Sequence, residues 1–252
     1  MSFRLEHHNQ IITILECLDC EILKKGSTFF GGGTLLALDF QEYRWSNDID
    51  FLSSVSTGGY KYLRTKIFDN GYEILFDDTS QIKIGRSTTD QYGIRMIVSV
   101  DDMPIKIEIV AETRFQLDLP RYTEWSSVPC LSLTDCFTSK LLSNSDRYMD
   151  NSVQARDLID LAVLRLNYPI PQSSIDKAEN AYEVIRPLKR AIKNFQNTPN
   201  YREKCFTSLR VEKVQIPKII DGIDLLSKDL DLPNTQRTFQ EQHDIFEDYL
   251  DS

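Results

Sequence analysis

A glycine turn that directly follows an apolar segment constrains the fold of this chain more than any other feature. Residues 29–34 read Phe-Phe-Gly-Gly-Gly-Thr, and apolar residues continue over residues 34–39. Glycines at the start of a helix let backbone N–H groups approach an anion, and the helix N-terminus adds its partial positive charge. We therefore expect a strand near residues 28–30, a short helix over residues 34–39, and a turn between them that can bind phosphate.

Two aspartates, Asp48 and Asp50, follow this turn within the apolar segment 47–52. The segment predicts a strand, on which both carboxylates share one face with Cα atoms about 6–7 Å apart. Carboxylates this close repel unless a cation compensates their charge, and Mg²⁺, or Mn²⁺, prefers such oxygen ligands together with phosphate. Asp-x-Asp also occurs in sugar-nucleotide glycosyltransferases. In combination with the glycine turn, the pair favours a site for a nucleotide and a metal.

A third carboxylate is predicted on a later strand. Residues 72–112 alternate with period two, which predicts a strand meander. In its last strand, residues 105–110, isoleucines alternate with Lys106 and Glu108, so these two side chains lie on the opposite face. A carboxylate beside the aspartate pair would complete a two-metal site, in which the ions clamp the attacking and leaving oxygens. Glu108 is our candidate and Glu112 its substitute; the alternative is a glutamate on a half-solvated strand.

The chain becomes helical after residue 130. Capping residues followed by an apolar stripe predict a helix that carries Lys140 close to the core. A second helix is expected over residues 155–166, where the spacing of three residues places Asp157 and Asp160 on one face.

Two longer helices are expected from periodicity alone. Apolar residues recur at helical spacing over residues 11–23, with Gly26 as a stop. A long helix is expected from residue 173 or 174 onward, with a kink at Pro187 because proline lacks the N–H that an interior helical position donates.

Composition excludes several classes of protein. With 41% hydrophobic and 27% charged residues in 252, the chain is typical of soluble globular proteins. The N-terminus lacks the layout of a secretory signal, and no apolar run approaches about 18 residues, so we expect a cytoplasmic protein with no membrane partner. Five scattered cysteines, an odd number, argue against structural disulfides.

The charge is unevenly distributed. The net charge of −9 argues against a broad nucleic-acid-binding surface. Residues 229–252 hold seven acids and one arginine, whereas residues 176–228 have a net charge of +4. The basic segment is either a solvated helix face or a contact for nucleic acid. We expect three parts: residues 1–128, a helical domain over 129–230, and an acidic tail over 231–252.

These motifs, in this order, resemble the AbiEii abortive-infection toxin family of the nucleotidyltransferase superfamily, which includes DNA polymerase beta and antibiotic-modifying nucleotidyltransferases. The matching stretches are residues 32–38, 46–51, 106–110, 133–135, 139–141 and 156–161. The resemblance spans about residues 26–166. It implies an α+β nucleotidyltransferase fold, with a mixed β-sheet flanked by helices in a catalytic domain and a helical C-terminal half that completes the active site.

The resemblance also implies roles for single residues. Asp48 and Asp50 would hold Mg²⁺ on a triphosphate, with Glu108 as third ligand and as helper in deprotonating the acceptor. The implied nucleotide-binding residues are Gly32, Gly33, Thr34, Ser46 and Lys140. The implied catalytic residues are Asp48, Asp50, Glu108 and Lys140, completed by Asp157 or Asp160.

The implied reaction is attack of an acceptor hydroxyl on the α-phosphate of a nucleoside triphosphate, with pyrophosphate leaving. By analogy with relatives, the protein would be the toxin of a toxin–antitoxin pair, with RNA, including tRNA, as acceptor and a cognate antitoxin as partner. Two alternatives stay open. The acceptor could be a small molecule or a protein hydroxyl, or the chain could be a non-catalytic interaction protein that keeps the fold. Against the latter, the carboxylate positions and Lys140 are all present.

Overall fold

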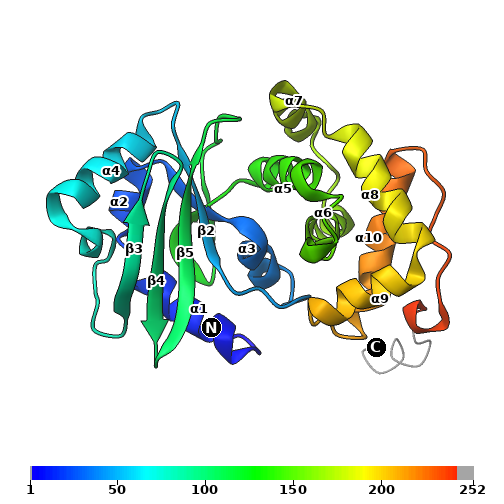
Figure 1. The fold of residues 1–252 in the computed structure, drawn as a ribbon, viewed down its shortest axis with the longest axis horizontal. Coiled ribbons are helices and arrows are strands. Elements are labelled where there is room, and N and C mark those ends of the chain that lie inside the picture. Colours follow the sequence, from blue (N-terminus) through cyan, green and yellow to red (C-terminus); the bar gives the residue numbers. More distant parts are fainter. Residues whose placement is uncertain (1, 243–252) are drawn as a thin grey trace. The chain divides into compact units, whose positions relative to one another are not determined.

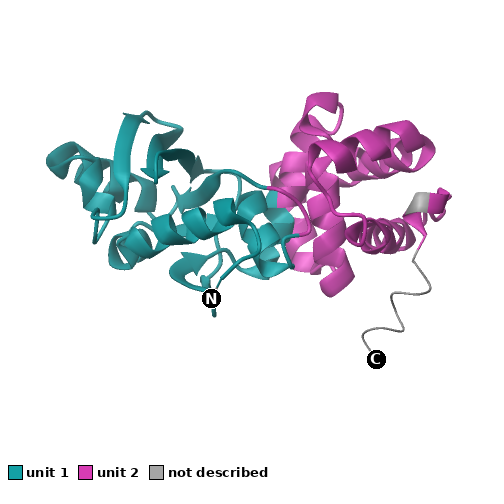
Figure 2. Ribbon diagram, turned by 90° about the horizontal axis from the view of Figure 1, so that it is seen from below, with its two compact units in different colours: residues 1–42, 46–139 teal, residues 43–45, 140–252 magenta. Residues whose placement is uncertain are grey.

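The computed structural model describes residues 2–242, which fall into two compact units (Figures 1 and 2). Unit 1 contains residues up to 42 and residues 46–139, and unit 2 contains residues 43–45 and those from 140 onward. The last ten residues of the predicted acidic tail, 243–252, lie outside the described residues. The division into a catalytic domain, a helical domain and a tail, with boundaries after residues 128 and 230, concerns function and stays a prediction.

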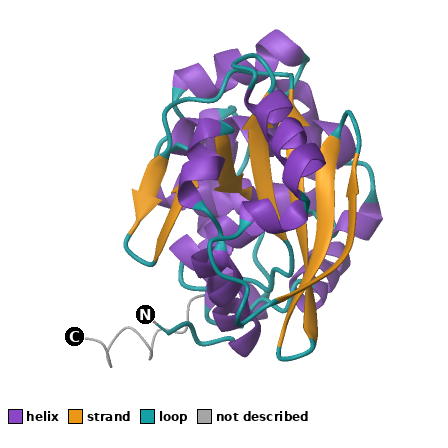
Figure 3. Ribbon diagram, turned by 90° about the vertical axis from the view of Figure 1, so that its left-hand side faces the viewer, coloured by secondary structure: helices purple, strands orange, loops and turns teal. Residues whose placement is uncertain are grey.

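Unit 1 is built on a seven-stranded mixed sheet in the order β3-β4-β5-β2-β1-β7-β6 (Figure 3). The strands are β1 (Thr28–Gly31), β2 (Ile49–Ser54), β3 (Lys83–Thr89), β4 (Gly93–Val100), β5 (Met103–Glu112), β6 (Arg121–Thr123) and β7 (Ser126–Cys130). Strand β2 runs antiparallel to β1 and parallel to β5, and β1 runs parallel to β7. The mixed sheet flanked by helices that was expected is therefore confirmed.

Alternation along β4 and β5 gives this part of the sheet one buried face and one open face. Ile105, Ile107 and Ile109 are buried, whereas Lys106 and Glu108 between them are half-exposed. Helices α1 (Glu6–Cys17), α2 (Cys20–Lys25) and α4 (Gly59–Asn70) pack against the sheet (Figure 1). The apolar side chains fill the buried face, which leaves the charged side chains of β5 on the other.

The helices of unit 1 correct one expectation. They are α1 (Glu6–Cys17), α2 (Cys20–Lys25), α3 (Gly32–Asp39) and α4 (Gly59–Asn70). The single helix expected over residues 11–23 is wrong, because the chain breaks at Leu18 and Asp19. The Asp19 side chain accepts a hydrogen bond from Ile22 N at 2.9 Å and so caps the start of α2.

Unit 2 is helical, and the unit boundary falls inside α5 (Leu133–Arg147), after Ser139. The other helices are α6 (Arg156–Asn167), α7 (Gln172–Ala181), α8 (Ile185–Asn197), α9 (Pro199–Ser208) and α10 (Gln215–Asp229). The long helix expected to kink at Pro187 is wrong. The chain breaks at residues 182–184, and Pro187 lies in the first turn of α8, where its missing N–H leaves no intrahelical bond unmade.

Helix α10 packs closely on α6 through a glycine. A Cβ atom added at Gly222 would lie 2.2 Å from the carbonyl oxygen of Ala162. The buried face of α10 also includes Ile219 and Ile223. No helix in the described part of the chain is both long enough and apolar enough to cross a membrane.

We expect Gly222→Ala to lower the free energy of unfolding by about 1–3 kcal/mol, because the added methyl group forces α6 and α10 apart. Urea unfolding followed by the helical circular dichroism signal measures this change. Lys218→Ala, at an exposed position of the same helix, is the control and should shift stability by less than about 0.5 kcal/mol. Equal unfolding midpoints for the two variants would contradict the close packing.

Candidate active site

The glycine turn brings a carboxylate to the start of a helix. Strand β1 ends at Gly31 and α3 begins at Gly32, whose φ of 70° lies in the left-handed region that other residues rarely adopt. A Cβ atom at Gly32 would lie 2.4 Å from Asp50 Oδ2. Gly32 is therefore required twice, by the backbone turn and by the carboxylate that lies against it.

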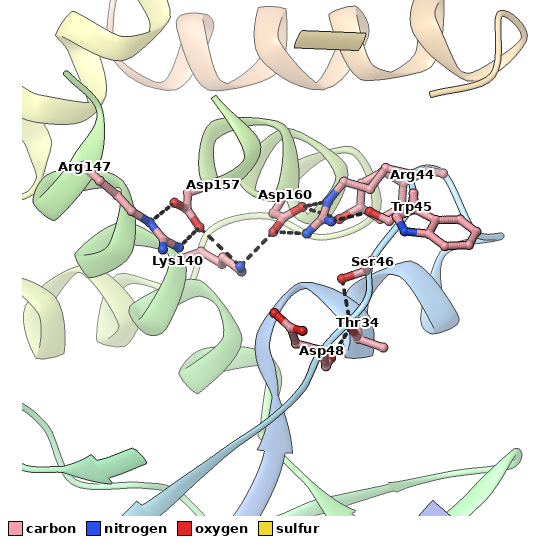
Figure 4. A network of polar contacts seen from close by, with 10 residues as sticks. Thr34, Arg44, Trp45, Ser46, Asp48, Lys140, Arg147, Asp157 and Asp160 are labelled. Carbon is pink, nitrogen blue, oxygen red and sulfur yellow. Dashed lines mark hydrogen bonds and ion pairs between the residues drawn. The ribbon is translucent and has the colours of Figure 1, made fainter. Parts of the chain in front are cut away.

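Two hydroxyl groups tie the loop before β2 to α3 (Figure 4). The buried Thr34 hydroxyl donates to the carbonyl oxygen of Asp48 at 2.5 Å, and Thr34 Oγ1 lies 2.8 Å from Ser46 Oγ. Thr34 and Ser46 thus order the loop that carries Asp48. The contact of these two residues with a nucleotide phosphate stays a prediction.

Asp50 lies on the open face of β2, whereas Asp48 lies in the loop two residues before it, because the strand expected over residues 47–52 begins only at Ile49. Both are half-exposed, whereas Ile49 and Phe51 are buried. Within the described residues no hydrogen-bond donor reaches the Asp48 carboxylate, which extends freely in Figure 4. Two hard carboxylate oxygens beside the start of α3 fit Mg²⁺ and a phosphate group by their chemistry.

Glu108 lies in register with Asp50 on the neighbouring strand β5. Its carboxylate accepts hydrogen bonds from Arg95 Nε at 2.8 Å and from Lys106 Nζ at 2.6 Å. Partial burial opposes ionisation, but the hydrogen bonds and charges of Lys106 and Arg95 outweigh it and hold the pKa of Glu108 below its ordinary value. A carboxylate with a lowered pKa is a weak proton acceptor at neutral pH.

Among the described residues, no group of three or more His, Cys, Asp or Glu side chains is arranged to hold one metal ion. The role of Glu108 as third metal ligand therefore stays a prediction. Glu112, named as its substitute, pairs in register with Ser54 at the far end of β2, and its carboxylate is bound by the Arg114 side chain at 2.7 and 3.0 Å.

The structure brings the three predicted residues of unit 2 together in one buried cluster (Figure 4). Lys140 Nζ lies 2.7 Å from Asp160 Oδ2 and 3.3 Å from Asp157 Oδ1. Arg147 holds Asp157 from the other side, with Nε and a terminal nitrogen at 2.7 and 2.9 Å. Each carboxylate thus has at least two cationic donors, and Lys140 is shared between them.

Asp160 is completely buried and saturated with donors. Arg44 binds it through two nitrogens at 2.7 and 2.9 Å, and the Tyr43 hydroxyl donates to it at 2.6 Å. Burial alone would raise the pKa of Asp160, yet the charges of Arg44 and Lys140 hold this pKa far below its ordinary value. The two carboxylate oxygens of Asp160 already accept from four donors and cannot bind substrate as well, so Asp160 holds Arg44 and Lys140 in position.

Three members of this cluster were not predicted from the sequence. Arg147 lies seven residues after Lys140, a spacing that places both on one face of α5, so helical periodicity could have found it. Tyr43 and Arg44 come from the short segment between α3 and β2, for which no pattern predicts a structure.

The sequence matches the model of a known protein family. A family model described as "Nucleotidyl transferase AbiEii toxin, Type IV TA system" matches residues 14–244. The chain belongs to this AbiEii family. It is a nucleotidyltransferase, and membership of a toxin–antitoxin family implies a nucleotide substrate and an antitoxin partner. No curated protein sequence gives a significant match to the chain.

Two solved structures from Helicobacter pylori share the fold. The structure of JHP933 is 15% identical, has a TM-score of 0.50, and is matched over 91% of this chain and 95% of its own. A second, described as a "putative nucleotidyltransferase", is also 15% identical with a TM-score of 0.50, over 92% of this chain and 98% of its own. At this identity the likeness shows the fold, and it confirms the nucleotidyltransferase fold that the motifs imply.

We expect Gly32→Ala to destabilise the protein by about 1–3 kcal/mol more than Gly58→Ala. Both glycines have positive φ, 70° and 77°, so both substitutions strain the backbone. Only the Cβ at position 32 would collide with Asp50, because nothing lies within 4 Å of a Cβ at Gly58. Urea unfolding measures the difference, and equal losses for the two variants would mean that Asp50 does not rest against Gly32.

We expect Asp160→Asn to cost about 3–5 kcal/mol at pH 7, because it leaves the buried cations Arg44 and Lys140 without their shared counter-charge. The pKa of Asp160 is lower in the folded than in the unfolded chain, so its stabilisation is complete above the unfolded value of about 3.9 and is lost as the pH falls below it. The difference in stability between wild type and variant should therefore shrink below about pH 4.

Urea unfolding at a series of pH values tests this, with Glu203→Gln at an exposed position of α9 as control. A stability difference that stays constant through the acid range would contradict the ionised state of Asp160.

Proposed function

We propose that this protein uses Mg²⁺ to transfer a nucleoside monophosphate from a nucleoside triphosphate to a hydroxyl group of an RNA acceptor, including tRNA. The observation that supports this most directly is the contact of Asp50 with Gly32 at the first turn of α3, with Asp48 two residues earlier in the adjoining loop. Backbone N–H groups that can bind an anion and carboxylates that can bind a cation lie close together there, and a triphosphate with a bound metal needs both.

In this mechanism the chain acts mainly by positioning. The first N–H groups of α3, at Gly32 and Gly33, have no partner within the helix and would donate to phosphate oxygens. Asp48 and Asp50 would hold the metal, which when bound neutralises negative charge on the triphosphate. Thr34 and Ser46 keep the loop of Asp48 in place. Orientation and charge stabilisation of this kind supply most of the rate enhancement in phosphoryl transfer.

The acceptor oxygen forms a bond to the α-phosphorus while the bond to the bridging oxygen breaks, so pyrophosphate leaves with that oxygen. Glu108, in register with Asp50, is the candidate to receive the acceptor proton. Its lowered pKa means that the proton passes on to water. Within unit 2, Lys140 is held by Asp157 and Asp160, and its role as a nucleotide-binding residue stays a prediction from the sequence.

The biological setting follows from the family. As a member of a toxin–antitoxin family, the protein would act as the toxin of an abortive-infection system whose cognate antitoxin counters it. Because nucleoside triphosphates and RNA are its substrates in this proposal, it would act in the cytoplasm.

The proposal is tested by incubating the purified protein with each labelled nucleoside triphosphate, Mg²⁺ and total RNA. We expect label in RNA, and a loss of at least about a hundredfold in Asp48→Asn and Asp50→Asn, since metal ligation is worth several kcal/mol in the transition state. Asp69→Asn, at an exposed position of α4, is the control and should keep full activity.

Label in a small molecule or in protein would contradict RNA as acceptor. Full incorporation by Asp48→Asn at saturating Mg²⁺ would contradict the metal site.

A further inference from the structure

A row of polar side chains crosses the open face of the sheet from the carboxylate pair outward. Asp50 on β2 lies in register with Glu108 on β5, Glu108 with Arg95 on β4, and Arg95 with Thr88 on β3. Neighbouring strands are about 4.8 Å apart, so the row extends roughly 14 Å beyond Asp50. Because cross-strand partners share a face, all four side chains point to the same side.

An irregularity in β3 adds a cation to this face. The register shifts between Ile84 and Ser87, so two residues of β3 oppose Ile97 of β4. Ser87 is the partner of the buried Met96, and Arg86 before it therefore points to the open side. Bulges of this kind commonly redirect a side chain near an active site. Lys83, opposite Ser99, lies on the same side.

We call the resulting set the cationic face. It consists of Lys83, Arg86, Arg95 and Lys106. Lys106 and Arg95 share Glu108, whereas Lys83 and Arg86 are exposed and make no ion pair with any described residue. The net charge of the whole chain is −9, so a group of four basic side chains on one face, two of them without an ion pair, differs from the acidic character of the chain as a whole.

We propose that the cationic face binds the phosphodiester backbone of the polynucleotide acceptor. The inference rests on the proposed function of the same site, and it assigns the acceptor to polyanionic polymers. A small acceptor needs only the residues next to the carboxylate pair, because its hydroxyl is all that must reach Asp48 and Asp50. A polymer brings further phosphates, and the cations of β3, β4 and β5 continue the row in which these phosphates would lie.

The competing explanation is that β3 carries cations because it is an edge strand. Charged side chains on an edge prevent pairing with another chain and need no ligand. The two explanations differ in one measurable quantity, since only the first makes the affinity for a polynucleotide depend on Lys83 and Arg86.

The test is the double variant Lys83→Ser with Arg86→Ser, which leaves the carboxylate pair untouched. Binding of a labelled single-stranded RNA to the full chain is followed by fluorescence anisotropy at several salt concentrations, without nucleotide or metal. We expect the Kd to rise about tenfold and the slope of log K against log salt to fall by about 1.4, or 0.7 per lost phosphate contact. The KM for RNA should rise while the KM for the nucleotide stays unchanged.

The matched control removes two other exposed cations, Lys61 and Arg64 on α4, which also form no ion pair with a described residue. It should leave the Kd and the salt slope unchanged. Both double variants should melt at the wild-type temperature, because all four side chains are exposed. Single-stranded DNA of the same length should lose affinity as much as RNA does, since the contacts are to phosphate.

The proposal is overturned if the Kd of the β3 variant is unchanged, or if the α4 control loses as much affinity for RNA. It is also overturned if only the affinity for RNA falls and not that for DNA, or if poly-glutamate binds more tightly than RNA. This failure is distinguishable from failure of the proposed function. If nucleotide transfer to RNA does not depend on Lys83 and Arg86, the cationic face is contradicted and the proposed function stands. If RNA binds through the cationic face but no nucleotide is transferred to it, the proposed function is contradicted and the cationic face stands.

Discussion

The contact between Asp50 and Gly32 is the constraint on which the proposed nucleotide site depends. An aspartate on β2 can approach the first turn of α3 only because residue 32 has no side chain, and α3 can begin there only because glycine adopts a positive φ. The pairing of β1 with β2 places Gly31 opposite Asp50 and so determines this approach. The start of α3, where we propose that phosphate binds, and the Asp50 carboxylate, which we propose as a metal ligand, are thereby joined through one backbone position.

Charge compensation distinguishes the two groups of acids that the sequence singles out. Asp157 and Asp160 are buried and surrounded by arginine and lysine donors, so cations of unit 2 already neutralise their charges. Removing one member of a buried ion cluster is strongly destabilising, although the cluster as a whole adds little net stability to the fold. Asp48 is half-exposed and has no donor within the described residues at its carboxylate, which is what a metal ligand requires. We therefore assign Asp157 and Asp160 to holding their cations in place, and Asp48 to the proposed metal site.

Local patterns were reliable where one physical rule acted alone. Period-two alternation correctly placed Lys106 and Glu108 opposite the buried isoleucines of β5. The glycine turn correctly predicted a helix after β1 that ends at Asp39, although α3 begins at Gly32, two residues before the expected start. Periodicity failed where a cap competed with it. The helix expected over residues 11–23 breaks because Asp19 starts a new one, and Pro187 lies in the first turn of a helix instead of kinking one. In both cases a single residue at a helix end outweighed the apolar repeat.

The sequence by itself determined the site's ingredients: the glycine turn, the Asp48 and Asp50 pair, and their order along a nucleotidyltransferase of the AbiEii family. These follow from rules that act over a few residues. The tertiary structure decided which acids are already neutralised, because cation partners such as Arg44 for Asp160 lie more than a hundred residues away in the chain. It likewise decided that Arg86 joins Arg95 and Lys106 on one face, since strand register and a bulge are set by pairing between strands.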